Sequence, residues 1–274
     1  MSAPKTGARN KPMVVVTGGA GGIGRAICDV AAGQGWRVVV ADINEVAARE
    51  VAAACGGHAC AMDITDEKNV DEVATAIEAA HGPVKAVIHS AATFGDLRAA
   101  DETPLADWDR ITGLVHRGTF IVHVAFAKRM AARGGGSIVT LSSWNGVRSA
   151  RMHAYCTAKA AVNLLTESMA AEWGRSGVRF NTVSPGVVMT ERVAERIASG
   201  TRYTIPPPEL TALGRLVTAR EVAEAAVFLI SDKASGISGA NLAVDAGTLV
   251  TQAWGMFGGV PKARERTGDH VHSA

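Results

Sequence analysis

Short apolar runs rich in valine alternate along most of the chain with longer stretches in which apolar residues recur at helical spacing. Most of these runs are apolar at nearly every position, which is typical of parallel strands that are buried on both faces. The intervening segments supply the helices that cover those faces. The sequence therefore predicts an α/β protein with a doubly wound, seven-stranded parallel sheet and helices on both faces, its strands given by MVVVT, RVVVADI, HACAMDI, KAVIHSA, GSIVTLSS, VRFNTVSP and ANLAVDAG.

Length and composition favour one domain over several. With 274 residues and 47% hydrophobic content, the chain can bury one substantial core. We therefore expect a single domain over residues 1–274, with its core in 13–250. The stretch 189–213 breaks the alternation and carries PPP at 206–208, so we interpret it as a lid. Residues 251–274 are expected to form a C-terminal extension that ends in a polar, frayed tail.

Charge and cysteine usage exclude several classes of partner. The net charge is +2 and the basic residues are scattered, so neither a nucleic-acid surface nor a basic membrane patch is expected. No signal peptide is visible, and no run approaches the roughly 18 apolar residues of a membrane span. The four cysteines lack metal-binding or disulfide spacing, which favours buried thiols. We expect a cytoplasmic protein without a bound metal, whose partners are small molecules or copies of itself.

A glycine-rich turn follows the first strand. The segment TGGAGGIG, residues 17–24, leads from that strand into the helix-compatible RAICDVAA. Glycines at such a turn permit positive φ and let a pyrophosphate approach backbone N–H groups, where the helix dipole favours negative charge. A plain tight turn is the alternative, but the strand before it and the helix after it favour a dinucleotide site.

The next strand ends at Asp42, eighteen residues after Gly24. A carboxylate at this position would accept hydrogen bonds from both ribose hydroxyls and would repel a 2′-phosphate. The glycine-rich loop contains no Arg or Lys that would bind an extra phosphate. The sequence therefore predicts NAD rather than NADP as the cofactor. The alternative is a solvated aspartate at the end of a strand.

The segment YCTAK, residues 155–159, places a phenol and an ammonium four positions apart in an apolar helical stretch. At this spacing Tyr155 and Lys159 lie on one face of a helix, with Cβ atoms roughly 5–6 Å apart. Taken alone, such a pair more often belongs to a solvated helix face. The rest of the chain decides between the two interpretations.

Four segments match the motifs of a single enzyme family in order and spacing. TGGAGGIG is similar to a T-G-x-x-x-G-I-G turn, YCTAK to a Y-x-x-x-K pair, and NTVSPGVVMTE to a segment after the sixth strand. LGRLVTAREVAEAAVFLISDKASGISGANLAVDAG is similar to the closing helix, loop and last strand. Residues 13–248 thus resemble the short-chain dehydrogenase/reductase family. The resemblance implies a Rossmann-like fold and NAD-dependent hydride transfer between a secondary alcohol and a ketone, in a homotetramer or dimer.

In the mechanism that this resemblance implies, Tyr155 takes the proton of the substrate hydroxyl. A phenol titrates near 10, so a neighbouring cation must stabilise the phenolate at neutral pH, and Lys159 supplies it. The third catalytic residue is a serine, for which the distance to Gly146 selects Ser143 and the spacing to Tyr155 selects Ser142. We choose Ser143, because a strand end and its glycine turn fix position, whereas a one-residue deletion in the following loop costs little.

The same resemblance implies the residues that hold the cofactor. The glycine-rich turn and Asp42 hold the adenosine half, and Lys159 also holds the nicotinamide ribose. Val188 and Thr190 hold the carboxamide. The predicted cofactor residues are Gly18, Gly21, Gly22, Ile23, Gly24, Asp42, Asp63, Ile64, Ser90, Ala91, Tyr155, Lys159, Val188 and Thr190.

The chain departs from the family pattern at two places. HSAA at 89–92 stands where the family has N-N-A-G. Val115 stands where the family has a helix asparagine that supports a water chain from the lysine to solvent. His116 is the neighbouring candidate to replace that asparagine, although it lies about 100° around the helix. The departures leave open a second reading, a catalytically impaired NAD-binding protein of the same fold.

Substrate specificity is less constrained. Trp144, Asn145, Met152, His153 and Met189 are expected to line the pocket together with the lid, and their bulk and apolarity favour a hydrophobic secondary alcohol or ketone. The apolar segment 251–259 is expected to cover the pocket or a subunit contact.

Overall fold

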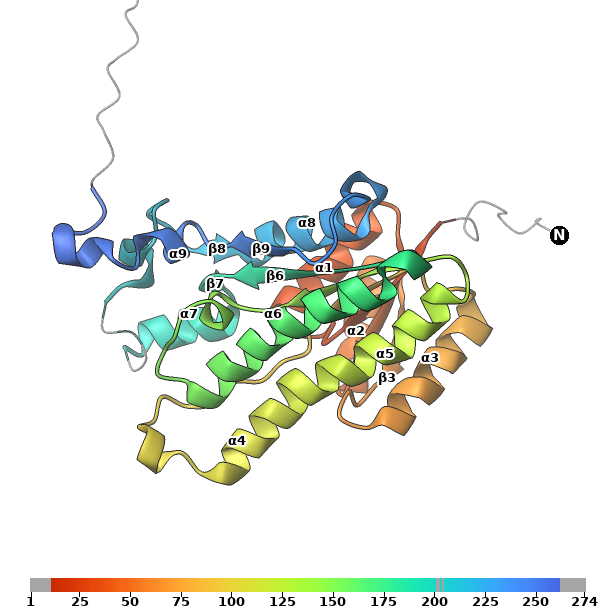
Figure 1. The fold of residues 1–274 in the computed structure, drawn as a ribbon, viewed down its shortest axis with the longest axis horizontal. Helices are drawn as coiled ribbons and strands as arrows, with labels where there is room; N and C mark the ends of the chain where they lie inside the picture. The colour runs from red at the N-terminus through yellow and green to blue at the C-terminus, as the bar shows by residue number, and fades with distance from the viewer. Residues whose placement is uncertain (1–10, 201–202, 204, 262–274) are drawn as a thin grey trace, which may run out of the picture.

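The computed structural model describes residues 11–200, 203 and 205–261. Its centre is a seven-stranded parallel sheet with the strand order β3-β2-β1-β4-β5-β6-β9 (Figure 1). Each strand predicted from the sequence contains one strand of this sheet, so the predicted fold class is confirmed. The strands are β1 Met13–Thr17, β2 Arg37–Asp42, β3 His58–Ala61, β4 Ala86–His89, β5 Gly136–Leu141, β6 Val178–Pro185 and β9 Asn241–Val244.

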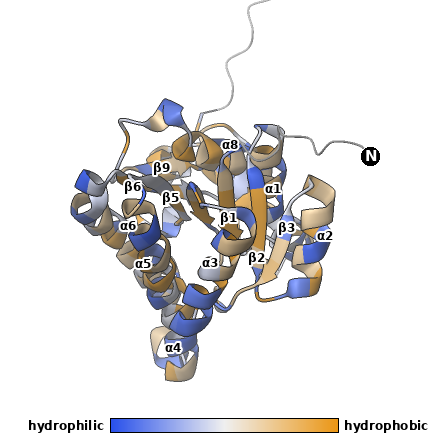
Figure 2. Cartoon of the chain, turned by 90° about the vertical axis from the view of Figure 1, so that its right-hand side faces the viewer, coloured by the Kyte–Doolittle hydropathy of each residue, from blue (hydrophilic) through white to orange (hydrophobic). Residues whose placement is uncertain are grey.

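Two layers of helices cover the sheet (Figure 2). One layer contains α1 Gly22–Gly33, α2 Glu45–Cys55 and α8 Ala219–Ile230, and the other contains α3 Glu67–His81, α5 Gly118–Ala131 and α6 His153–Trp173. The helix α4 Leu105–Thr112 continues into α5 through a π-helical turn, Gly113–Arg117.

The apolar runs are continuous because both faces of the central strands are buried. Val14 and Val16 of β1 pack in the core beneath α1 and α8, whereas Val15 packs in the core beneath α3 and α5. Successive side chains of a strand point to opposite faces, so a strand between two helical layers needs an apolar residue at every position. The largest fully buried side chains are Phe126 of α5 and Phe180 of β6.

The strand order creates a crevice at the carboxyl ends of the strands. The chain leaves β1 toward β2 on one side and later returns to β4 on the other side of β1. Loops that follow β1 and β4 therefore diverge, and ligands of open α/β sheets bind at such a switch point.

The segment predicted to be a lid contains the short strand β7 Val188–Met189, which pairs with β8 Val217–Thr218, and the helix α7 Glu191–Ala198. The C-terminal segment contains α9 Thr248–Thr251 and a 3₁₀ turn at Trp254–Phe257. Figure 1 shows both at the same end of the molecule. Residues 201, 202 and 204 of the predicted lid and 262–274 of the predicted extension lie outside the described residues.

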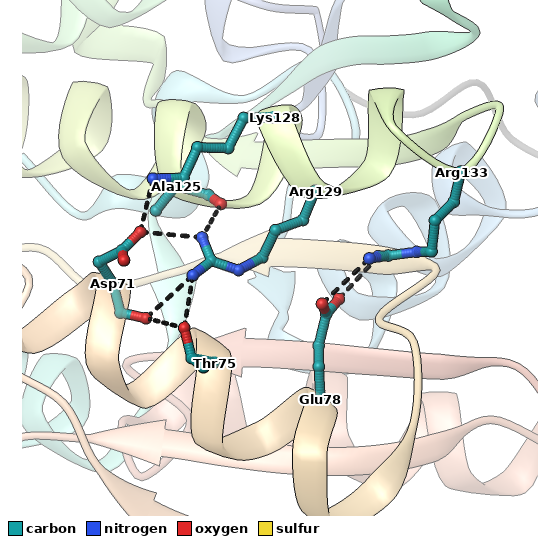
Figure 3. A network of polar contacts seen from close by, with 7 residues as sticks. All are labelled: Asp71, Thr75, Glu78, Ala125, Lys128, Arg129 and Arg133. Carbon is teal, nitrogen blue, oxygen red and sulfur yellow. Dashed lines mark hydrogen bonds and ion pairs between the residues drawn. The ribbon is translucent and has the colours of Figure 1, made fainter.

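A polar network joins α3 to α5 on the outside of the molecule (Figure 3). The Asp71 carboxylate lies 2.6 Å from Lys128 Nζ and 2.9 Å from Arg129 Nη1. Further along α3, Glu78 pairs at 2.6 Å with Arg133 of the turn that follows α5. The hydrogen bonds from Arg129 and then Lys128 lower the pKa of Asp71 to about 2.

Asp71→Asn should lower the melting temperature at neutral pH, because the amide cannot pair with the two cations. The lowered pKa means that this stabilisation is complete above the ordinary value of 3.8 and is lost as the pH falls toward about 2. Thermal unfolding at several pH values measures the effect. Glu72→Gln, which removes an exposed 3.7 Å pair with Lys68 in the same helix, should change little. If the difference in melting temperature between the wild type and Asp71→Asn stayed the same at low pH, this account would be contradicted.

Candidate active site

A cleft of about 910 Å³ opens at the carboxyl ends of the strands. Every residue predicted to hold the cofactor lines it, from Gly18 in the first turn to Thr190 before α7. Ser143, Tyr155 and Lys159 line the same cleft. The fold thus brings together all the site residues that the sequence predicted.

The glycine-rich turn forms one wall. Gly18 has φ +65°, and α1 begins at Gly22. A Cβ on Gly24 would overlap the carbonyl oxygen of Gly18, and a Cβ on Gly18 would lie 2.6 Å from the Ala91 backbone. The turn therefore leaves a concave space, here called the glycine cradle, that side chains at Gly18 and Gly24 would fill. The first N–H groups of α1 have no partner within the helix. This geometry fits a dinucleotide pyrophosphate.

Asp42 is held in place at the end of β2. Its carboxylate accepts hydrogen bonds from the backbone N–H of Ala20 at 3.1 Å and of Asn44 at 3.0 Å. Arg25 also lines this end of the cleft, where its Nε donates to the Ala20 carbonyl at 2.9 Å. The sequence reading did not include Arg25, because this residue follows the last glycine of the turn.

The helix α6 presents the predicted Tyr155–Lys159 pair as expected. Lys159 Nζ lies 5.8 Å from the centroid of the Tyr155 ring and donates a 2.6 Å hydrogen bond to the Leu141 carbonyl at the end of β5. The lysine is only 3% exposed. Burial disfavours the charged form and lowers the pKa of Lys159 to about 7.

The two serines after β5 differ in what their hydroxyl groups do. Ser142 Oγ donates to the carbonyl of Lys159 at 3.3 Å. Ser143 Oγ accepts a 3.1 Å hydrogen bond from Asn145 N–H, which leaves its own proton to donate. This arrangement supports the choice of Ser143 over Ser142 as the serine that orients a substrate oxygen.

The two departures from the family pattern lie close to the catalytic helix and strands. Val115 is 1% exposed and packs against Ala158 and Val162 of α6. His116 is exposed and is not part of the cleft lining, so its position gives no support to its replacing an asparagine there. His89, in place of an asparagine, is buried and contacts Thr17.

The substrate end of the cleft agrees with the sequence reading in part. Trp144, Asn145 and Met152 line it, while His153 lines a smaller adjoining cavity beside Tyr155. The expectation for Met189 was wrong, because this side chain is 46% exposed on β7 and is not part of the lining.

Sequence reasoning missed Phe94, and it included Arg196 only as one residue of the predicted lid. The Phe94 ring meets Tyr155 edge to face, with centroids 6.0 Å apart, and Arg196 Cζ from α7 lies 4.6 Å from the Phe94 centroid. Phe94 lies in an irregular segment, so no periodic pattern could have indicated where its side chain points.

The described residues contain neither a cluster of metal-ligating side chains nor a helix that could span a membrane. Across residues 11–200, 203 and 205–261, no three His, Cys, Asp or Glu side chains come together as metal ligands. Over the same ranges, no helix is long and apolar enough to cross a membrane.

Comparisons with known proteins agree with this geometry. The family described as enoyl-(acyl carrier protein) reductase matches residues 18–248. D-threitol dehydrogenase of Mycolicibacterium smegmatis is 38% identical over 87% of this chain and 93% of its own length. NAD-dependent glycerol dehydrogenase of Listeria innocua is 34% identical over 87% of this chain and 94% of its own.

Among solved structures, one described as ribose-5-phosphate isomerase from Brucella melitensis 16M has a TM-score of 0.89 at 39% identity. The alignment covers 92% of this chain and 98% of that one. Fold, cleft and relatives together define a nicotinamide-dependent oxidoreductase that acts on alcohols. The chain belongs to the short-chain dehydrogenase/reductase family. The reading as a catalytically impaired binding protein is not favoured by relatives that are named as dehydrogenases.

Gly24→Ala should destabilise the fold by about 1–3 kcal/mol, because a Cβ there overlaps the Gly18 carbonyl. It should also raise the Kd for NAD about tenfold or more, since the turn must shift away from the geometry that fits the pyrophosphate. Gly33→Ala in the same helix is the control, since a Cβ there meets nothing within 4 Å. It should be neutral or stabilising by up to about 1 kcal/mol. Nicotinamide fluorescence titration and thermal unfolding measure the two effects. Equal NAD affinity in both variants would count against the cradle.

Proposed function

We propose that this protein interconverts a secondary alcohol and a ketone with NAD as the hydride carrier. The observation that carries the proposal is that Ser143, Tyr155 and Lys159 meet in the cleft that the dinucleotide residues line. When bound, NAD accepts the hydride from the alcohol carbon or returns it to the ketone. The residues of the chain bind and orient the substrate and the cofactor, and one of them takes up or releases the proton of the substrate hydroxyl.

Each of the three side chains has a distinct task. The Ser143 hydroxyl donates a hydrogen bond to the substrate oxygen and fixes its position. Tyr155 Oη takes the hydroxyl proton during oxidation and returns it during reduction. When protonated, Lys159 favours the phenolate form of Tyr155, because an opposite charge within about 4–6 Å stabilises an anion. The phenolate in turn favours the ammonium and so opposes the effect of burial on the pKa of Lys159. At 3% exposure, this lysine acts with little screening by water.

Tyr155→Phe should lower kcat by about 10²–10⁴-fold, because phenylalanine has no hydroxyl group to take or return the proton. The Kd for NAD should stay within about twofold, since the cradle and Asp42 are untouched. Reduced nicotinamide formed with a panel of polyols and simple secondary alcohols is the readout. Substantial activity in Tyr155→Phe would show that the mechanism is wrong. An isomerase reaction, the activity in the name of the Brucella structure, would produce no net reduced nicotinamide in the wild type.

The preference for NAD is assigned to Asp42. Its carboxylate is fixed by two backbone N–H groups and faces the cleft, where it would accept bonds from ribose hydroxyls and repel a 2′-phosphate. The nearby Arg25 opposes this preference, but its Nε is already engaged by the Ala20 carbonyl.

The ratio of kcat/KM with NAD to kcat/KM with NADP should fall about tenfold or more in Asp42→Ala, because this substitution removes the charge that repels the 2′-phosphate. Arg25→Met is the matched control at the same end of the cleft. It should leave that ratio unchanged or raise it. Steady-state kinetics with both coenzymes measures the ratio. Equal use of the two coenzymes by the wild type would overturn the assignment.

The substrate that fits best is a polyol or another secondary alcohol with an apolar face. The relatives named for D-threitol and glycerol support a polyol. Trp144, Met152 and Phe94 would pack on the carbon chain, while Asn145 and Arg196 would meet further hydroxyl groups. This assignment extends the expected hydrophobic substrate to one that also carries polar groups.

The protein is further proposed to assemble as a homotetramer or dimer. Trp254 is 48% exposed, and Met256 and Phe257 are 80% exposed, so the C-terminal segment presents an apolar surface that a second copy would cover. A cytoplasmic location fits the four cysteines, which are all free thiols.

A further inference from the structure

Two buried histidines contact each other beneath α5, one of them near Lys159, and the mechanism above does not use them. His89 at the end of β4 is 2% exposed, and His123 of α5 is fully buried. Their rings meet edge to face with centroids 6.4 Å apart. Buried histidines of this kind are polar groups inside the apolar layer between the sheet and α5, so each of their nitrogens needs a hydrogen-bond partner.

The sheet register explains how the pair is held. Thr17 of β1, His89 of β4 and Thr140 of β5 are neighbours across three adjacent strands. Residues in register on parallel strands point to the same face, here the face that α5 covers. His89 Nδ1 shares a 2.6 Å hydrogen bond with Thr17 Oγ1, and His123 Nε2 shares a 2.7 Å bond with Thr140 Oγ1. Each ring is thus anchored through one nitrogen.

The other nitrogen of each ring has no partner. His89 Nε2 and His123 Nδ1 are both shielded from solvent and form no hydrogen bond within the described part of the chain. A neutral imidazole carries one N–H and one lone pair, so each ring retains one unused bonding position. Burial lowers the pKa of both histidines, that of His123 to about 3, so both rings are neutral at physiological pH.

Lys159 lies near His89 and the end of β5. Its Nζ donates to the carbonyl of Leu141, the residue that follows Thr140 in β5. It is close enough to His89 for its charge to contribute to the lowered pKa of that ring. An ammonium has three N–H donors, and a buried ammonium needs more than one acceptor. Val115, which packs against α6 nearby, provides no polar side chain.

We propose that an ordered internal water is bound between His89 Nε2 and His123 Nδ1 and accepts a hydrogen bond from Lys159. Polar cavities inside proteins usually hold such waters, which make about three hydrogen bonds each. The two histidines are then positioning residues: they act on Tyr155 through the water and Lys159. The titratable groups that face His89 are His123 from α5 and Lys159 from α6. This inference rests on the proposed dehydrogenase function only for its kinetic test.

The two nitrogens of each ring can be separated by matched amide substitutions. The short side chain of Asn places a polar atom near Nδ1 of a histidine, and the longer Gln places one near Nε2. His89→Asn therefore keeps the bond to Thr17 and loses the contact with the water, while His89→Gln does the reverse. For His123 the pattern is crossed, because Gln keeps the bond to Thr140 and Asn keeps the water contact.

If the water positions Lys159, His89→Asn and His123→Gln should lower kcat about fivefold or more and shift the pH midpoint of alcohol oxidation upward. The reason is that a less firmly held ammonium stabilises the Tyr155 phenolate less. His89→Gln and His123→Asn should stay near the wild type. Folding and NAD affinity are checked by thermal unfolding and fluorescence titration. The reverse pattern, or no change in any variant, would overturn the proposal.

A crystal structure of the unmodified protein with NAD tests the same inference without kinetics. Electron density for a water within hydrogen-bond distance of His89 Nε2 and His123 Nδ1 is expected, and its absence would overturn the proposal even if a variant failed to fold. A wild type that turns over none of the alcohols would refute the proposed function instead, and the crystallographic result would still decide on the water.

Discussion

The site depends on the buried ammonium of Lys159 and on the contacts that hold it. Removing an ammonium from water is costly unless acceptors replace the solvent. The end of β5 supplies one such acceptor, the Leu141 carbonyl, and Ser142 Oγ joins the same strand end to the helix by donating to the backbone carbonyl of Lys159. A Cβ on Gly146 would lie 2.9 Å from the Lys159 backbone, so the turn after β5 can pack this closely on α6 only with glycine there. Strand end, turn and helix thus form one rigid support for the charge.

The rest of the fold positions the other residues of the cleft relative to this support. The carboxyl ends of β1, β2 and β4 place the glycine cradle, Asp42 and the Ser90–Ala91 turn along one cleft. The strand β5 and the helix α6 place Ser143, Tyr155 and Lys159 in the same cleft. Because strands between two helical layers are rigid, residues far apart in the sequence keep fixed positions around the cleft. Phe94 contacts the Tyr155 ring on one side and Arg196 of α7 on the other, so it connects α6 to α7 in this part of the cleft.

Much of this could be predicted from the sequence, because the signals are local. Continuous apolar runs predict buried strands, and the glycine turn and the Tyr155–Lys159 spacing are properties of short segments. The sequence favours Ser143 over Ser142 through its distance to Gly146, and the structure adds what each hydroxyl group contacts. The error at Met189 has the opposite origin, since apolarity alone does not show which way a side chain of a two-residue strand points. Long-range contacts such as His89 with Thr17, 72 positions apart, depend on strand register and leave no periodic pattern in the sequence.

The central claim is that Lys159 makes the Tyr155 phenol acidic enough to act as a base. The chain contains only two tyrosines, so Tyr203→Phe leaves Tyr155 as the sole source of tyrosinate absorbance. A spectroscopic pH titration of this variant should give a midpoint well below the phenol value of about 10, and adding Lys159→Met should raise it by roughly one unit or more. A midpoint near 10 that does not respond to the loss of Lys159 would contradict the account.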